Sequence, residues 1–177
     1  MKFPARTEYH DYYHTYIKIL PEANPITLLE KAQEHTLKVI ESIPTDLYDY
    51  RYAEGKWTIK EVLIHLTDCE QILSYRALRF ARQDFQSALP FDENDYVRAL
   101  GTTTLSWDYL VSSTKLLRAQ TIHLFKGFTA EESQRGGSEA FPNTVQAVAC
   151  IIAAHQLHHI SVLEERYLKQ AVTPFVV

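Results

Sequence analysis

Residues 58–69 read TIKEVLIHLTDC, and this stretch predicts the N-terminal part of a long helix with one buried face. Thr58 and Glu61 have the spacing of a capping box, in which the hydroxyl and the carboxylate accept hydrogen bonds from otherwise unpaired backbone N–H groups. Apolar side chains then recur every three or four residues, which places them on one face of a helix. That stripe consists of Ile59, Val62, Leu66, Cys69, Ile72 and Leu73. We expect the helix to continue to about Arg82.

Three other segments also predict long helices. Asn24 can cap a helix that starts at Pro25, because proline is well suited to the first helical position. The expected helices span residues 25–42, 58–82, 103–125 and 144–169. The apolar anchors expected for the third helix are Leu105, Tyr109, Leu116, Leu117, Ile122 and Phe125. Four long helices without a clear strand signal predict an all-α fold, a four-helix bundle with long connections.

The size and charge of the chain limit the classes of protein to which it can belong. Its 177 residues suit one domain over residues 1–177, with the bundle core over about 26–168 and an N-terminal arm over 1–25. A net charge of -4 gives no support for binding nucleic acid or an anionic membrane. Cys69 and Cys150 are not spaced as a disulfide scaffold. With no signal-peptide pattern and no run of about eighteen apolar residues, we expect a cytoplasmic protein without a membrane span.

Three histidines are predicted on the inward faces of two helices. His65 lies on or beside the apolar stripe of the second helix. Residues 155–159 read HQLHH, and at about 100° per residue His155 and His159 fall within the apolar sector of the last helix, with His158 at its edge. The other members of that sector are Val145, Val148, Ile152 and Val162. Buried imidazoles need polar partners, and one metal ion would satisfy all three.

The residues alone leave two explanations for these histidines open. Three imidazoles suit a zinc, nickel, cobalt or iron ion, and three protein ligands leave room for water or substrate. Alternatively, the three side chains hydrogen-bond with one another and with water inside the bundle. Cys69 either approaches the same site or is a small core residue. His10 and His14 share the four-residue spacing but lack an apolar helix around them, which favours a surface role.

Both histidine segments resemble those of a known family. Residues 57–68, WTIKEVLIHLTD, resemble the second-helix motif of DinB/YfiT-like proteins, and residues 155–159 resemble their last-helix motif, His-x-x-x-His. The order and separation of the motifs also match, and the resemblance covers residues 26–168 approximately. It implies a four-helix bundle, often a homodimer, in which three histidines hold a divalent metal, commonly nickel or zinc. Carried over residue by residue, these ligands are His65, His155 and His159.

The resemblance also implies a range of activities. The broader superfamily includes S-transferases and isomerases that use a low-molecular-weight thiol, and some hydrolases. We therefore interpret the chain as a metal-dependent enzyme that activates such a thiol, or a water, against a small electrophile. Its partner would then be a small-molecule substrate, with no nucleic acid and no membrane. The alternative is a non-catalytic, dimerising metal-binding bundle related to stress. The roles of His10, His14, His158 and Cys69 stay open.

Overall fold

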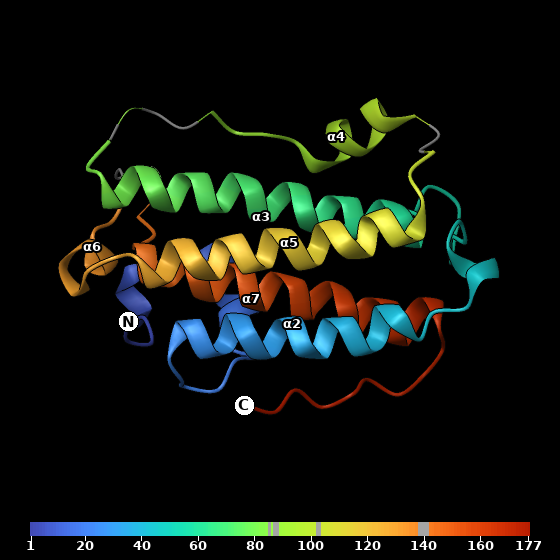
Figure 1. Ribbon diagram of the computed structural model, residues 1–177, viewed down its shortest axis with the longest axis horizontal. Coiled ribbons are helices and arrows are strands. Elements are labelled where there is room, and N and C mark those ends of the chain that lie inside the picture. The colour runs from blue at the N-terminus through green and yellow to red at the C-terminus, as the bar shows by residue number, and fades with distance from the viewer. Residues whose placement is uncertain (85, 87–88, 102–103, 138–141) are drawn as a thin grey trace.

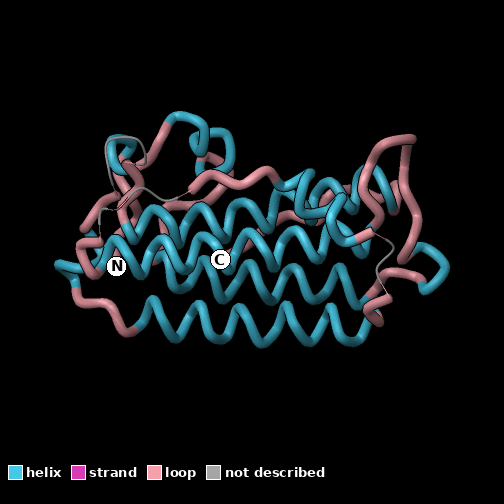
Figure 2. The backbone as a smooth tube through the Cα atoms, turned by 90° about the horizontal axis from the view of Figure 1, so that it is seen from above, coloured by secondary structure: helices cyan, strands magenta, loops and turns pink. Residues whose placement is uncertain are grey.

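The protein is a bundle of four long helices. The computed structural model describes residues 1–84, 86, 89–101, 104–137 and 142–177, and within them the chain forms helices and no strands. The long helices are α2 (Pro25–Glu41), α3 (Ile59–Ala81), α5 (Trp107–Lys126) and α7 (Val145–Val162). They lie side by side in Figure 1, and the view from above in Figure 2 shows the connections gathered at the bundle ends and along one side. The all-α, four-helix-bundle prediction is confirmed.

The capping residues predicted for α2 and α3 have the expected contacts. The Thr58 hydroxyl accepts a hydrogen bond from the Glu61 N–H at 3.1 Å, and the Glu61 carboxylate accepts one from the Thr58 N–H at 2.7 Å. The Asn24 side chain accepts a hydrogen bond from the Ile26 N–H at 2.9 Å. These local bonds satisfy N–H groups that have no partner within the helix. They therefore fix where each helix begins.

Helix α5 begins later than the sequence predicts. Ser106 is its N-cap, because the Ser106 hydroxyl accepts a hydrogen bond from the Tyr109 N–H at 3.2 Å. The predicted start, Thr103, lies outside the described residues. Three of the predicted apolar anchors are wrong, since Leu105 is 37%, Tyr109 is 56% and Leu116 is 73% exposed. The buried face of α5 instead carries Leu110, Thr114, Arg118, Thr121 and Phe125.

An internal ion pair explains why that face of α5 is polar. Arg118 is 1% exposed and donates two hydrogen bonds, each 2.8 Å long, to the carboxylate of Glu70 on α3. It donates a third, 2.9 Å long, to the carbonyl of Leu29 on α2. A buried charge is tolerated when it is paired and hydrogen-bonded. Arg118 thus joins three helices through polar contacts that apolar patterning does not reveal.

The order of helix directions is unusual for a bundle with short loops. In Figure 1, α3 and α5 run in the same direction, and the connection between them returns along the outside of the bundle. Helix α4 (Glu93–Leu100) lies on this connection and packs against α3 through the buried side chain of Val97. The connection from α5 to α7 carries the short helix α6 (Ala130–Gln134). The long crossover therefore brings α4 alongside α3.

Helix α7 is the central element of the core. Its residues from Val145 to Ala154 are all buried, and it packs against both α2 and α3. A π-helical turn, Leu163–Tyr167, continues it. Val145–Tyr167 is the one helix in the described part of the chain that is long and apolar enough to cross a membrane, and 72% of its apolar window is buried inside the bundle. Its apolar character is therefore accounted for by the core.

The two chain ends lie against the bundle. The N-terminal arm contains two 3-10 turns, Arg6–Glu8 and Asp11–Tyr13, and then α1 (His14–Ile17), which packs against α7. After the π-helical turn, the chain runs back beside α2 in Figure 1. Glu164, buried at 2% exposure, accepts hydrogen bonds from the N–H and hydroxyl of Thr173 in this returning segment. A further 3-10 turn, Thr45–Leu47, lies between α2 and α3.

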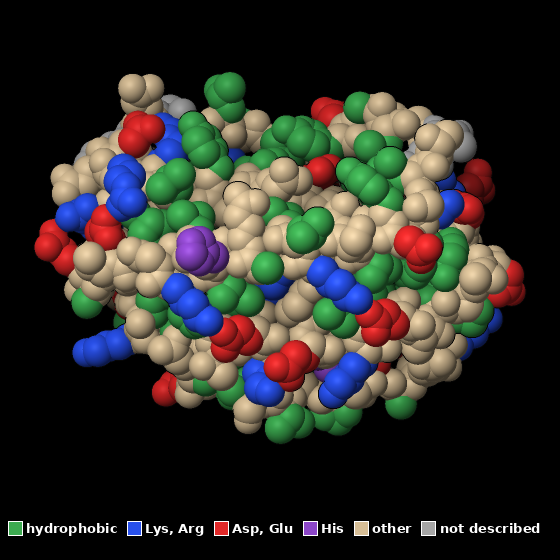
Figure 3. All heavy atoms as spheres, viewed as in Figure 1, with side chains coloured by type: hydrophobic (Ala, Val, Ile, Leu, Met, Phe, Trp, Pro, Cys, Tyr) green, Lys and Arg blue, Asp and Glu red, His purple; other side chains and the backbone are tan. Residues whose placement is uncertain are grey.

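The outer face of α2 and α5 carries both signs of charge. Lys and Arg side chains are interspersed with Asp and Glu in the view of Figure 3. Lys115 and Lys126 on α5 form 2.7 Å ion pairs with Glu41 and Glu30 on α2. Exposed pairs of this kind contribute little stability. This face has no extended patch of positive charge of the kind that binds nucleic acid.

Candidate metal centre

The three histidines predicted to face inward meet between α3 and α7. The Nε2 atom of His65 lies 3.2 Å from the Nε2 atom of His155 and 3.2 Å from that of His159. The Nε2 atoms of His155 and His159 are also 3.2 Å apart. The four-residue spacing on α7 places both of its rings on one face, and the packing of α3 against α7 brings the third ring to them. Three ring nitrogens thus form an equilateral triangle.

Within this triangle there is little room for protons on the three Nε2 atoms. A neutral imidazole has one N–H, on Nδ1 or on Nε2, and a lone pair on the other nitrogen. An Nε2–H would point along its ring axis into the middle of the triangle, where one hydrogen fits. At least two of the three rings therefore direct lone pairs at the same point. A cation at that point would turn this repulsion into attraction.

The electrostatic surroundings keep the three rings neutral. Burial lowers the pKa of His65 to about 4. Burial, with the nearby His65 and His158, lowers the pKa of His155 to about 3. Burial also holds the pKa of His159 well below its usual value. Neutral imidazole is the form that binds metals, so near pH 7 all three side chains are in their ligating state.

The donor set fits a divalent metal ion. Nitrogen ligands about 2.0–2.1 Å from one zinc ion at tetrahedral angles lie about 3.4 Å from each other. The three observed separations of 3.2 Å are close to that value. A trio of neutral imidazoles suits zinc, nickel, cobalt and iron. Geometry, charge state and donor type therefore agree.

Aromatic rings surround the triangle on two sides. The Trp57 ring lies 4.7 Å from the His65 ring and is stacked at 6.4 Å from the His159 ring. On another side, the Tyr16 ring lies 5.9 Å from His155. Rings at these distances limit the access of water to the nitrogens. The sequence did not identify Trp57 or Tyr16 as site residues, since both lie outside the long helices. The one signal that could have indicated Trp57 was its position directly before the Thr58 cap of the helix that carries His65.

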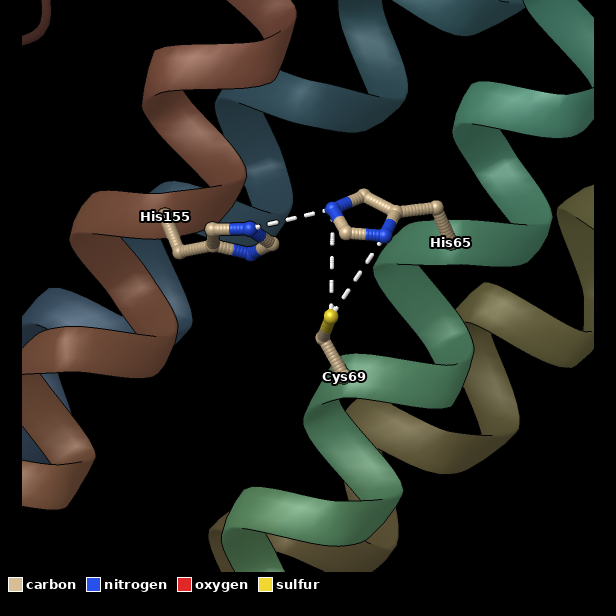
Figure 4. A group of neighbouring side chains, drawn as sticks. All are labelled: His65, Cys69 and His155. Carbon is tan, nitrogen blue, oxygen red and sulfur yellow. Dashed lines mark hydrogen bonds between the residues drawn. The ribbon is translucent and has the colours of Figure 1, made fainter. Parts of the chain in front are cut away.

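Cys69 also reaches this site, as Figure 4 shows. Its Sγ atom lies 3.5 Å from Nδ1 and 3.8 Å from Nε2 of His65. His65, Cys69 and His155 each offer a ligand atom within 4.8 Å of the others. Burial raises the pKa of the Cys69 thiol to about 12, so without a cation the thiol keeps its proton. Of the two roles left open by the sequence, Cys69 has the position beside the site.

The remaining histidines lie outside the triangle. The exposed His158 packs edge-on against the rings of Tyr16 and His159, each at 5.1 Å. His10 accepts a hydrogen bond from the Tyr12 N–H at 3.1 Å through its Nδ1. His14 is 3.3 Å from the Tyr9 hydroxyl through its Nδ1. The exposed side chains of His10 and His14 therefore make local contacts within the N-terminal arm.

A cavity of about 380 Å³ adjoins the site on the side of Trp57. Its lining includes Trp57 and Glu61, which precede His65 on the chain, and Val97 from α4. The charged side chains Arg51 and Arg98 also line it. Arg51 donates hydrogen bonds of 3.0 and 3.1 Å to Glu61, so much of its charge is compensated. The cavity is large enough for a small molecule.

Comparisons with known proteins agree with this architecture. A family model described as the DinB superfamily matches residues 28–163. A solved structure of YfiT from Bacillus subtilis, described as a probable metal-dependent hydrolase with an unusual four-helix bundle topology, superposes with a TM-score of 0.69. That match has 17% sequence identity and covers 96% of this chain and 95% of that one. At this identity the likeness concerns the fold. No curated protein matches the chain.

Proposed function

The chain belongs to the DinB superfamily, and we propose that it is a metal-dependent enzyme in which His65, His155 and His159 hold one divalent ion. The observation that carries this proposal is the set of three equal Nε2 separations of 3.2 Å. A cation at the point where the three neutral imidazoles converge would stabilise their Nε2 lone pairs more than hydrogen bonds among the rings would. Nickel or zinc is the proposed metal, with cobalt or iron as alternatives.

The proposed reaction is attack by a water or a low-molecular-weight thiol on a small electrophile. A bound divalent ion supplies Lewis acidity and lowers the pKa of such a nucleophile. The aromatic rings of Trp57 and Tyr16 would exclude bulk water from the reacting groups and give the substrate an apolar wall. The cavity beside Trp57 would hold the rest of the substrate. Hydrolysis is favoured over S-transfer because the similarly folded YfiT is described as a probable hydrolase.

The burial of His65 supports a second candidate function. This ligand is 6% exposed, and a metal ion that is bound only for stability needs no path to solvent. A non-catalytic bundle that binds its metal for stability would need no substrate cavity. Turnover by the metal-loaded protein distinguishes the enzyme from the structural bundle.

We also propose a cytoplasmic homodimer, on the resemblance stated above and the general frequency of twofold symmetric dimers.

The first test is the metal content of the protein. Untagged protein, purified without added metal or chelator, would be measured by elemental mass spectrometry. We expect about one ion per chain in the wild type and in His123→Ala, which removes an exposed histidine of α5. We expect no stoichiometric metal in His65→Ala. A wild type that stays metal-free after reconstitution would disprove the proposal.

A further inference from the structure

Tyr167, at the end of the π-helical turn, is bonded to the residue whose ring packs on the histidines. Its hydroxyl donates a 2.7 Å hydrogen bond to the backbone carbonyl of Trp57. That carbonyl lies outside the ladder of α3, which begins with the 3.0 Å bond from the Val62 N–H to the Thr58 carbonyl. A carbonyl shielded from water and outside a helix needs another donor. Tyr167, which is 5% exposed, supplies it.

The π-helical turn sets the direction of Tyr167. The Leu168 N–H donates to the Leu163 carbonyl, five residues earlier, at 2.9 Å, whereas an α-helix would pair residues four apart. At about 100° per residue, a regular α-helix would place Tyr167 about 80° around the axis from His159. The wider π turn advances less per residue, so it moves Tyr167 back toward the face that carries His159. Single π turns are frequent at functional sites.

The bond from Tyr167 holds a ring that contacts two of the three imidazoles. The Trp57 ring lies 4.7 Å from the His65 ring and is stacked at 6.4 Å on the His159 ring, with 22° between the planes. Residues 53–56, which precede Trp57, are exposed, so this loop packs little against the bundle. The position of the indole therefore depends on the start of α3 and on the hydroxyl of Tyr167.

We propose that Tyr167 is a positioning residue of the metal site, whose hydroxyl holds the Trp57 indole over the histidines and so slows exchange of water and metal at their Nε2 atoms. This inference rests on the proposed function, because it concerns access to the same ion. Tyr167 acts through Trp57 and contacts neither the ion nor a substrate. Loss of the hydroxyl should raise the population with a displaced indole about fivefold, the factor that corresponds to one typical hydrogen bond.

Tryptophan fluorescence tests this role without reference to metal or activity. Trp57 is one of two tryptophans, so a Trp107→Phe background leaves it as the only one. In chelator-treated full-length protein, we expect Tyr167→Phe to increase the quenching of Trp57 fluorescence by acrylamide. Tyr52→Phe is the matched control, because its ring lies 4.8 Å from the Tyr167 ring while its hydroxyl accepts a hydrogen bond from Arg166. The control should be quenched like the background protein.

Release of bound zinc to an excess of chelator gives the second readout. Because the ion leaves when the indole is displaced, zinc-loaded Tyr167→Phe should release zinc about fivefold faster than the background protein. Tyr52→Phe should release zinc at the background rate. A loss of packing in the aromatic cluster alone would change both variants alike, so the comparison isolates the bond to the Trp57 carbonyl.

The possible outcomes separate the two proposals. Unchanged quenching or unchanged zinc release in Tyr167→Phe would overturn the role of Tyr167 and leave the three-histidine site standing. An equal change in Tyr52→Phe would also overturn it. A wild type that binds no zinc would overturn the metal site, and with it the role of Tyr167 in metal exchange. If Tyr167→Phe does not fold, Trp57→Ala decides, because it removes the indole and keeps the carbonyl: faster zinc release supports the proposal, and unchanged release overturns it.

Discussion

The buried histidines make the stability of the metal-free protein depend on pH. The pKa is lowered to about 4 for His65 and to about 3 for His155, from 6.5 in the unfolded chain. Between pH 6.5 and these folded-state values, the unfolded chain binds more protons than the folded protein. The free energy of unfolding is therefore highest above about pH 6.5 and decreases as the pH falls toward the folded-state pKa values. We expect a loss of at most about 1.4 kcal/mol per pH unit for each histidine.

Urea unfolding of chelator-treated protein at several pH values measures this loss. The variant His155→Gln removes one titrating group, so its free energy of unfolding should fall less steeply between about pH 6.5 and pH 4. His123→Gln removes an exposed histidine of α5 and should retain the slope of the wild type. Identical slopes for all three proteins would show that His155 takes up a proton as easily when folded as when unfolded.

At the scale of single elements, the capping box at the start of α3 provides the next prediction. Thr58→Ala removes the hydroxyl that accepts the Glu61 N–H, and loss of such a cap costs about 1 kcal/mol. The same change frees the first turn of the helix that carries His65. We expect a lower midpoint in chemical denaturation for Thr58→Ala, whereas Thr58→Ser, which keeps the hydroxyl, should stay near the wild type. Equal destabilisation by both would assign the effect to the lost methyl group.

The buried pair of Arg118 and Glu70 predicts a non-additive response. Arg118→Met leaves the Glu70 carboxylate buried without its partner, which costs about 3–5 kcal/mol. Glu70→Met likewise leaves the Arg118 guanidinium buried without its partner, whereas the double variant removes both charges. We expect the double variant to be less destabilised than the sum of the single variants. Additive free energies of unfolding would mean that the two charges do not interact, despite their 2.8 Å contacts.

The structural features that could be predicted from the sequence differ from one helix to another. The starts of α2 and α3 were predictable because Asn24 and Thr58 act on their own neighbours in the chain. The inward face of α5 was not predictable, because burial of Arg118 depends on Glu70, a distant partner. Helical periodicity placed His155 and His159 on one inward face, but their 3.2 Å approach to His65 depends on how α7 packs against α3. Cys69 shared the apolar stripe, so the sequence could not show that its sulfur lies against the His65 ring.

At the scale of the whole molecule, the candidate site connects segments that are distant in the chain. His65 lies on α3 and His155 and His159 lie on α7, so an ion bound by all three would join these helices. The crossover between α3 and α5 places α4 next to the same region, where it lines the cavity beside Trp57. Because each ligand position depends on the folded bundle, the unfolded chain would bind the ion weakly. Metal binding should therefore stabilise the native state.

Thermal unfolding with and without zinc tests this coupling. At a free zinc concentration about 100 times the dissociation constant, binding to the folded state adds about 2.7 kcal/mol. For a domain of this size, that corresponds to a rise in Tm of about 5–10 °C. His159→Ala removes one corner of the nitrogen triangle, so its Tm should respond little to zinc, whereas Cys150→Ser should respond like the wild type. An equal rise in His159→Ala would place the stabilising ion elsewhere on the protein, because the bundle itself would then have gained stability without the three converging imidazoles.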